Sequence, residues 1–260
     1  GGPGSVSVYG SVNGKLTQTS TINFPVLFPD MPFDGTYRTA TGDVNGDGVE
    51  DVAVITGPGA PVRFAVIDGR TGNSLLVPLT PAFAGSESFT GGGFVSVGDL
   101  DGDGRSEIVL TPDQGGGPRV TVFSVFPVGA RLRANFLGLN DPDFRGGART
   151  ALGDMNGDGK ADLVVMAGFM GGPRVAIFTG TSTLGGTPNH LVADFFAFPG
   201  ADADTLRNGA FVAAGDVTGD GRVDLVFGGG PGGGPRVFVL SGAQVSGGNV
   251  TGAQAAPVAN

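Results

Sequence analysis

Four short acidic loops hold the residues of this 260-residue chain that are best suited to chemistry. The first runs from Gly42 to Asp51, and the pattern returns at Gly98 to Glu107, Gly153 to Asp162 and Gly215 to Asp224. Counted from the first acid, oxygen-bearing side chains stand at positions 1, 3, 5 and 9, and glycines stand at positions 4 and 6. Carboxylate and amide oxygens on a tightly bent loop suit Ca²⁺, whereas softer metals favour nitrogen and sulfur. The spacing therefore predicts four calcium loops.

Each predicted site uses four side chains and the backbone carbonyl of position 7. The first loop would use Asp43, Asn45, Asp47, the carbonyl of Val49 and Asp51. The second would use Asp99, Asp101, Asp103, the carbonyl of Arg105 and Glu107. The third would use Asp154, Asn156, Asp158, the carbonyl of Lys160 and Asp162. The fourth would use Asp216, Thr218, Asp220, the carbonyl of Arg222 and Asp224. Thr218 is a poorer oxygen donor, so we expect the fourth site to lose calcium first.

The segments after the loops distinguish them from an EF-hand. An EF-hand needs a bidentate Glu at position 12 and a helix on each side. Position 12 is instead Val54, Leu110, Val165 or Phe227, inside a short apolar run rich in β-branched residues. Such runs are typical of strands. We therefore expect each loop to join two strands, with the acid at position 9 as its closing ligand.

The loops belong to a longer repeat. Their first acids are separated by 56, 55 and 62 residues, and a glycine-proline turn comes after each second strand. Three of these turns read Gly-Gly-Pro-Arg-Val, at 116–120, 171–175 and 233–237. A third strand is expected at 120–123, 175–178 and 237–240, and a fourth at 75–79, 131–139 and 191–198. One sheet of four strands cannot cover both of its own faces, so neighbouring repeats must stack on it.

The two ends of the chain are out of phase with this repeat. Gly2-Pro3 and residues 6–9 match the turn and third strand, and residues 15–24 match the fourth strand. Strands from both ends completing one shared blade would explain the offset, as would excision from a longer array. We predict one domain over residues 1–245, built from repeats of about 57 residues, and a flexible tail or weak edge strand over residues 246–260.

Composition narrows the function classes. The 51 glycines and 18 prolines favour short strands, and no window of 12 residues or more has helical apolar spacing. Thirteen of the 24 acids stand at predicted ligand positions of the loops, so most of the net charge of −9 is explained as metal ligand. We expect no nucleic-acid partner and no membrane span. The chain has no cysteine, which excludes disulfides and thiol nucleophiles.

These motifs resemble the FG-GAP repeats of the integrin α-subunit β-propeller and the related repeats of bacterial secreted and cell-surface proteins. The resemblance rests on the four loops, on an aromatic-x-glycine upstream of three of them, and on the glycine-proline segment downstream. It implies an all-β propeller of four-stranded blades with Ca²⁺ between the first two strands of each. Four loops and a terminal half-repeat favour four or five blades, and a fragment of a larger ring or array is the alternative.

Few residues outside the loops suggest ligand binding or catalysis. Arg119, Arg174 and Arg236 recur at one place in the repeat and could bind an anionic ligand together, or each could close its own turn by bonding carbonyls. His190 is the one histidine, and we find no serine or carboxylate spaced to make it a base. We therefore expect no enzyme.

The functions that remain are binding functions. The resemblance implies a protein-binding, adhesion or structural module with an unknown partner, and a calcium-dependent glycan-binding propeller is the alternative. A third candidate is an accessory domain of a larger secreted enzyme. Sites of this type belong to the weaker calcium affinities of extracellular modules, so we expect an extracellular, cell-surface or periplasmic location.

Overall fold

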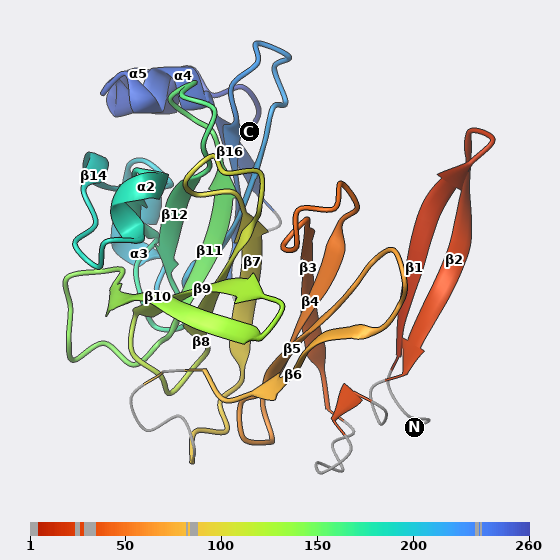
Figure 1. Ribbon diagram of the computed structural model, residues 1–260. Helices are drawn as coiled ribbons and strands as arrows, with labels where there is room; N and C mark the ends of the chain where they lie inside the picture. The colour runs from red at the N-terminus through yellow and green to blue at the C-terminus, as the bar shows by residue number, and fades with distance from the viewer. Residues whose placement is uncertain are drawn as a thin grey trace.

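A computed structural model of the chain describes residues 5–23, 27–28, 35–81, 83, 88–231, 234 and 236–260. The predicted turn at Gly2-Pro3 and parts of the segments 15–24 and 233–237 lie outside the described residues. The architecture is a β-propeller in which small antiparallel sheets, the blades, succeed one another along the chain (Figure 1). The predicted fold class is confirmed.

Three blades each have four strands, and strands that are consecutive in sequence are neighbours in the sheet. Blade one consists of β3 (Tyr37–Gly42), β4 (Asp51–Thr56), β5 (Phe64–Ile67) and β6 (Ser74–Leu79). Blade two consists of β7 (Gly93–Gly98), β8 (Glu107–Pro112), β9 (Arg119–Phe126) and β10 (Gly129–Leu137). Blade three consists of β11 (Ala148–Gly153), β12 (Asp162–Ala167), β13 (Arg174–Phe178) and β14 (His190–Phe196). Each predicted calcium loop joins the first two strands of its blade.

The ends of the chain depart from this pattern. Blade four has three strands, β15 (Ala210–Gly215), β16 (Asp224–Gly229) and β17 (Val237–Leu240). Its fourth strand is represented by one bridge, in which Val239 pairs with Ala259. At the other end, β1 (Ser5–Val12) and β2 (Lys15–Asn23) form the expected third and fourth strands as an isolated hairpin.

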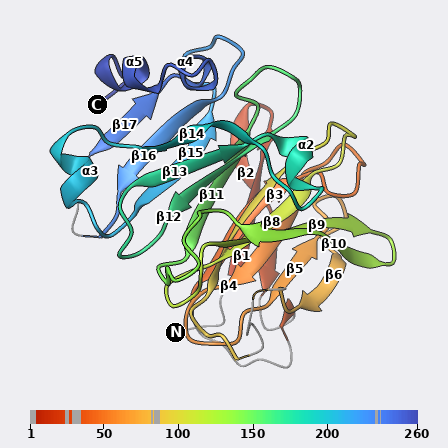
Figure 2. The same cartoon turned by 90° about the vertical axis from the view of Figure 1, so that its left-hand side faces the viewer.

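The segment for which the sequence predicted a flexible end or weak edge strand, residues 246–260, holds the bridging residue Ala259 and also a helix that was not predicted. Helices α4 (Gly242–Ser246) and α5 (Val250–Ala255) lie beside blade four (Figure 2). Ser241 and Asn249 cap them by accepting backbone N–H bonds at 3.4 and 3.1 Å. Val245 and Ala253 are fully buried in the core between blades three and four. These caps and apolar contacts explain why such short segments are helical.

Two more short helices flank the fourth strand of blade three. Helix α2 (Gly180–Thr183) lies between β13 and β14, and α3 (Ala201–Thr205) lies between β14 and β15. The longest described helix has six residues, in keeping with the absence of helical periodicity in the sequence. Among the described helices, none has the length and apolar character that crossing a membrane requires.

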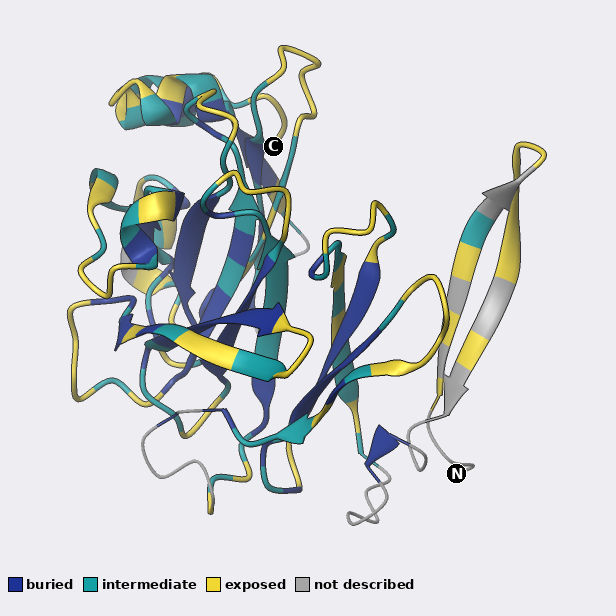
Figure 3. Ribbon diagram, in the orientation of Figure 1, coloured by how far each residue is buried: buried dark blue, intermediate teal, exposed yellow. Residues whose placement is uncertain are grey.

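The hydrophobic core lies between blades. Strands β4, β8 and β12 are buried at every residue because a neighbouring sheet or segment covers each of their faces (Figure 3). One cluster joins blade one to blade two, a second joins blade two to blade three, and a third joins blade three to blade four. Interblade packing therefore holds the loops at fixed positions on successive blades.

The innermost strands approach each other closely at a repeated glycine. A Cβ atom built on Gly98 would lie 3.1 Å from Leu152 of the next blade, and one on Gly153 would lie 2.7 Å from Val223. Gly42 meets Val97 of blade two in the same way. Side chains of one blade therefore fill the space that a larger residue would need on the blade before it.

A ladder of arginines and phenylalanines also links the innermost strands. The second residue of β3, β7, β11 and β15 is Arg38, Phe94, Arg149 and Phe211 in turn. The guanidinium carbon of Arg38 lies 3.8 Å from the Phe94 ring centre, and that of Arg149 lies 3.9 Å from the Phe211 ring centre. Each arginine also donates to the carbonyl before its phenylalanine. Cation–π contacts and hydrogen bonds thus join successive blades at one level.

Substituting the repeated glycine should test this close packing. We expect Gly153→Val to lower the free energy of unfolding by about 1–3 kcal/mol, because the added side chain overlaps Val223. The matched control is Gly215→Val, at the same place in blade four, where no described heavy atom lies within 4 Å of the new Cβ. That control should change stability by no more than about 0.5 kcal/mol in urea unfolding at low protein concentration. Equal losses in both variants would contradict the packing account.

Candidate metal centre

All four loops share one hydrogen-bonded backbone. In the first, the Asp43 carboxylate accepts from the backbone N–H of Gly46, Asp47 and Gly48 at 2.7, 3.1 and 2.7 Å. Gly46 and Gly48 have φ values of 78° and 80°, a conformation that other L-residues rarely adopt. The acid at position 1 repeats these bonds in the other loops. The alternation of acids and glycines thus encodes the shape of the loop.

The acid at position 9 is the buried member of each loop. Asp51, Glu107, Asp162 and Asp224 are at most 2% exposed. Each accepts the N–H of the position 2 residue at 3.0–3.1 Å. Burial raises the pKa of Asp51, that of Asp162 to about 6 and that of Glu107 to about 7. Removing these carboxylates from water disfavours their charge.

Position 3 makes the loops unequal. In loops one and three, the side-chain amides of Asn45 and Asn156 point at the position 9 acid, at 3.4 and 3.5 Å. In loop four, the backbone N–H of Thr218 donates to Asp224 at 2.9 Å. In loop two the residue is Asp101, whose ionised carboxylate has no proton to donate. Glu107 therefore faces a second negative charge where the other position 9 acids face a donor.

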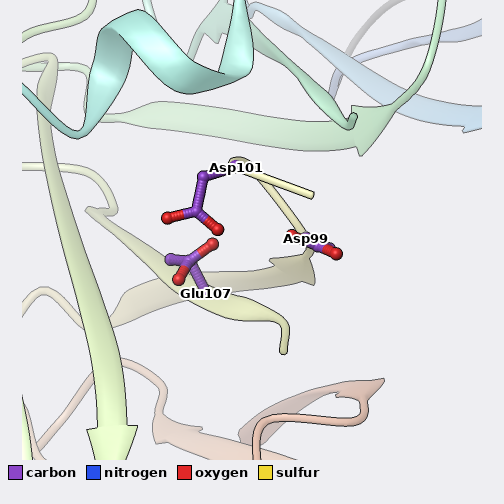
Figure 4. A group of neighbouring side chains, drawn as sticks. All are labelled: Asp99, Asp101 and Glu107. Atoms are coloured by element: carbon purple, nitrogen blue, oxygen red, sulfur yellow. The ribbon is translucent and has the colours of Figure 1, made fainter. Parts of the chain in front are cut away.

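Loop two brings three acids together. Oxygens of Asp99, Asp101 and Glu107 lie within 4.8 Å of one another, and Figure 4 shows Asp101 and Glu107 turned toward each other. Asp101 Oδ1 is buried and has no hydrogen-bond partner in the structure. The negative charge of Asp101 adds to burial in raising the pKa of Glu107. A hard divalent cation would neutralise this group and occupy the unpartnered oxygen, so these residues fit calcium.

The acids of the other three loops are less favourably arranged for binding a cation. In the described part of the chain, loop two is the one place where three acids each bring an oxygen so close to the others. In loop one, Arg70 Nε donates to Asp47 Oδ2 at 2.7 Å, so a guanidinium already bonds a predicted ligand. In loop three, Asn156 also donates to Asp158 at 3.2 Å. The remaining predicted ligands, including the carbonyls of Val49, Arg105, Lys160 and Arg222, stay predictions.

Residues outside the loops complete the loop-two site. Ser124 on β9 donates to Glu107 Oε1 at 3.0 Å, and Arg133 on β10 donates to Ser124 at 2.9 Å. Arg133 also lies 3.6 Å from Asp101 Oδ2. The sequence did not predict that Ser124, Arg133 or Arg70 contacts a loop. Ser124 and Arg133 lie on later strands of their blade and Arg70 lies in the turn between β5 and β6, places that carry no motif, and a β-bulge at Arg133 shifts the register.

The loops are connected from blade to blade. The carbonyl of Asp43 accepts from Ser106 N–H at 2.6 Å, that of Asp99 from Ala161 at 2.8 Å, and that of Asp154 from Val223 at 3.0 Å. Basic side chains at position 7 add to this link, because Arg105, Lys160 and Arg222 lie over the position 4 glycine of the preceding loop. Backbone hydrogen bonds and side-chain contacts therefore join each loop to the next.

Two of the three repeated arginines bind within their own blades, and Arg236 binds helix α3, between blades three and four, and the last residue of the chain. Arg119 donates to Asn135 on β10 at 2.6 Å, Arg174 to Asp194 on β14 at 2.6 Å, and Arg236 to Asp202 and Asn260. These acceptors are side-chain oxygens, not the carbonyls expected for turn closure. Each arginine lies on or just before a third strand, and Arg119 and Arg174 pair with residues near the outer edge of their blade.

His190 has a carboxylate neighbour that was not expected from the sequence. Its Nδ1 lies 3.2 Å from Asp194 Oδ1, on a strand whose pairing with β13 has two register irregularities. Arg174 binds the other oxygen of Asp194. The imidazole packs against Phe178 at 4.5 Å between ring centres, with the two rings tilted by 50°. These contacts tie the outer edge of blade three together.

The buried acids predict a pH dependence in calcium-free buffer. The pKa of Glu107 is about 7 when folded, against an ordinary value of 4.5, so the folded chain holds more protons between these values. The free energy of unfolding should therefore fall as pH rises from about 4.5 to 7. Glu107→Gln should flatten part of this dependence, while the exposed Glu50→Gln should leave it unchanged. Melting curves in a chelator would show this, and identical pH profiles for wild type and Glu107→Gln would contradict it.

Comparison with known proteins places the chain among repeat proteins of this design. It is 25% identical over 154 residues to integrin alpha pat-2 of Caenorhabditis elegans, which is 52% of this chain and 13% of that protein. Integrin alpha pat-2 of Caenorhabditis briggsae is 22% identical over 252 residues, or 88% of this chain and 21% of that protein. The chain thus spans about a fifth or less of the length of these relatives.

Solved structures share the fold. Rhamnogalacturonan lyase YesW has a TM-score of 0.50 and 15% identity, with 92% of this chain matched to 49% of the lyase. The rhamnogalacturonan lyase PL11 of Bacillus licheniformis has a TM-score of 0.50 and 13% identity, with coverages of 91% and 54%. The model of the FG-GAP-like repeat family matches residues 43–110 and 154–227, together more than half of the chain. The four loop-bearing blades are therefore repeats of this kind, and the chain belongs to the FG-GAP-like repeat family.

Proposed function

We propose that this chain is a calcium-stabilised β-propeller module of an extracellular, cell-surface or periplasmic protein, and that it serves as a binding or adhesion surface. The observation that carries calcium dependence is the group of Asp99, Asp101 and Glu107, with its buried and unpartnered Asp101 oxygen. Bound calcium would supply the positive charge that the group lacks. The carboxylates could then remain ionised although they are partly removed from water.

Calcium binding to these loops would stabilise the folded chain. The buried position 9 acid holds the N–H of position 2, and the carbonyl of position 1 holds the next loop. Repulsion between Asp101 and Glu107 acts against this closed arrangement when no cation is bound. Because the folded loop collects the ligands, binding free energy becomes folding free energy.

Chelation should lower the melting temperature of the protein. At calcium concentrations about 100 times the dissociation constant, one site adds about 2.7 kcal/mol to the free energy of unfolding. Differential scanning calorimetry with millimolar calcium and with excess chelator would measure the difference. Superimposable melting curves would refute calcium stabilisation.

Variants at position 3 should separate the loops. Asp101→Asn gives loop two the side chain that loops one and three carry, so the melting temperature in chelator should rise while the gain on adding calcium shrinks. Asn45→Asp should do the reverse, because it places a second carboxylate opposite Asp51. Glu50→Gln, an exposed acid in a loop but outside the ligand set, is the matched control. If Asp101→Asn lowers stability in chelator, the repulsion argument fails.

The four loops should also fill in order. Loop two, with four acids, should bind calcium most tightly, and loop four, where Thr218 replaces a carboxylate or amide, should release it first. Calcium titration followed by NMR of the loop glycine amides would resolve the order. Filling of loop four before loop two would contradict the ranking.

The binding partner is proposed to be a protein. Integrin alpha pat-2, whose name describes it as an integrin, is similar along most of this chain. Variable connections between blades, such as residues 180–189 and 199–208, are the natural places for partner specificity. We propose no catalytic role for the chain, since His190 and Asp194 are held by Phe178 and Arg174.

A glycan-binding function is the second candidate. A cavity of about 190 Å³ is lined by Phe89, Arg119, Leu137 and Arg145, together with glycines 115–117. Aromatic and guanidinium groups at one cavity suit an acidic sugar. A glycan array in calcium separates the two candidates: binding that is lost in Arg145→Ala supports the glycan, and an empty array supports the protein partner. A role as accessory domain of a secreted enzyme would follow only from binding to the substrate of that enzyme.

A further inference from the structure

The chain contains the dipeptide Asn-Gly four times, at Asn13, Asn45, Asn156 and Asn208. Asparagine before glycine is the sequence most prone to spontaneous loss of the side-chain amide, because glycine has no side chain to hinder attack by its backbone nitrogen. That nitrogen must be free to lose its proton, and the asparagine must be free to turn its side chain toward it. The hydrogen bonds of the structure decide which of the four dipeptides meets these conditions.

The dipeptide of loop one is held at both residues. The N–H of Gly46 donates to the Asp43 carboxylate at 2.7 Å, and this negative charge opposes loss of the proton. The Asn45 side chain accepts from the N–H of Asp47 at 2.9 Å, and its amide lies 3.4 Å from Asp51. Attack on the amide would have to break these bonds together, so we expect Asn45 to react slowly.

Loop three holds its dipeptide in the same way. Gly157 donates to Asp154 at 2.6 Å, and Asn156 accepts from the N–H of Asp158 at 2.8 Å. The Asn156 amide also donates to the Asp158 carboxylate at 3.2 Å. Loss of the amide would place a carboxylate at position 3, as in loop two. These bonds therefore also preserve the difference between the loops.

The dipeptide at Asn208 lies outside the loops and is held by other blade residues. Gly209 is buried, and its N–H donates to the carbonyl of Gly171 at 3.0 Å. The Asn208 amide donates to the carbonyl of Pro231. The attacking nitrogen and the amide under attack are thus each fixed by a separate backbone carbonyl.

The dipeptide at Asn13 is free of such bonds. Asn13 and Gly14 form the two-residue turn between β1 and β2, and their φ values of 52° and 74° match a type I′ turn. Both residues are exposed, and no hydrogen bond to either is found outside the strand ladder in the described part of the chain. The turn stands clear of the blades (Figure 1). A hairpin of two strands is only marginally stable, so its turn can change conformation readily.

We propose that Asn13 is a site of spontaneous deamidation and isomerisation in the folded protein, and that hydrogen bonds protect the same dipeptide at the other three places. The Gly14 nitrogen gives its proton to the solvent and forms a bond to Asn13 Cγ. The bond between Cγ and Nδ2 breaks, and Nδ2 takes a proton from water and leaves as ammonia.

Water then opens the resulting succinimide ring at one of its two carbonyl carbons. Attack at Cγ breaks the new bond and gives aspartate in a normal backbone. Attack at the Asn13 carbonyl carbon breaks the original peptide bond and gives isoaspartate, whose backbone runs through Cγ. Both products add a negative charge to the turn. Isoaspartate also lengthens the turn by one carbon, and turn length fixes the register of a hairpin.

Peptide mapping by mass spectrometry tests the proposal on the full chain, incubated in mildly alkaline buffer made with oxygen-18 water. Deamidation at Asn13 should be at least about tenfold faster than at each of the other three sites, because those sites react only after local opening. Asn13→Gln is the matched variant, since a longer side chain must close a larger ring. Oxygen-18 uptake in its turn peptide should be lost, and uptake at the other sites should not change.

Incubation in urea separates the effect of structure from the effect of sequence. The four dipeptides should then react at similar rates, because unfolding removes the bonds that protect three of them. Deamidation of Asn45, Asn156 or Asn208 as fast as that of Asn13 in the folded chain would overturn the proposal. An unmodified Asn13 in the folded chain, or the same order of rates in urea, would also overturn it.

Discussion

The structure depends on keeping one carboxylate buried at the end of each acidic loop. This acid, at position 9, starts the second strand of its blade and binds the backbone N–H of position 2. Position 2 in turn sends an apolar side chain into the core between blades in loops one to three. The same group therefore shapes the loop and anchors the blade. Its charge is unfavourable in this place unless donors or a cation compensate for burial.

The four loops differ in the group that faces the buried acid. Asparagine amides or a backbone N–H face the acid in loops one, three and four. Loop two places Asp101 there, and Ser124 and Arg133 compensate only in part, since one oxygen of Asp101 stays unpartnered. Repeats of one design thus differ in their need for a metal ion. Hydrogen bonds from loop to loop would let a cation at the second loop stabilise its neighbours.

The repeat made most of the fold predictable. Apolar runs after the loops predicted the second strands, and the glycine-proline turns predicted where the third strands begin. The acidic loops were also recognisable, because acids alternate with glycines at fixed spacing, and the role of their acids as calcium ligands stays a prediction. Ser124 and Arg133 were not predictable, since they reach loop two from later strands whose register depends on a bulge, and Arg70 reaches loop one from the turn between β5 and β6. The helices of the tail were missed because Ser241 and Asn249 cap segments too short to show periodicity.

We propose that loop two binds calcium by closing around a buried carboxylate. A crystal structure of the protein grown in millimolar calcium tests it most directly. We expect a peak at about 2.3–2.6 Å from oxygens of Asp99, Asp101 and Glu107, the range of calcium–oxygen distances. A well-ordered loop two that holds only water at that calcium concentration would contradict the account.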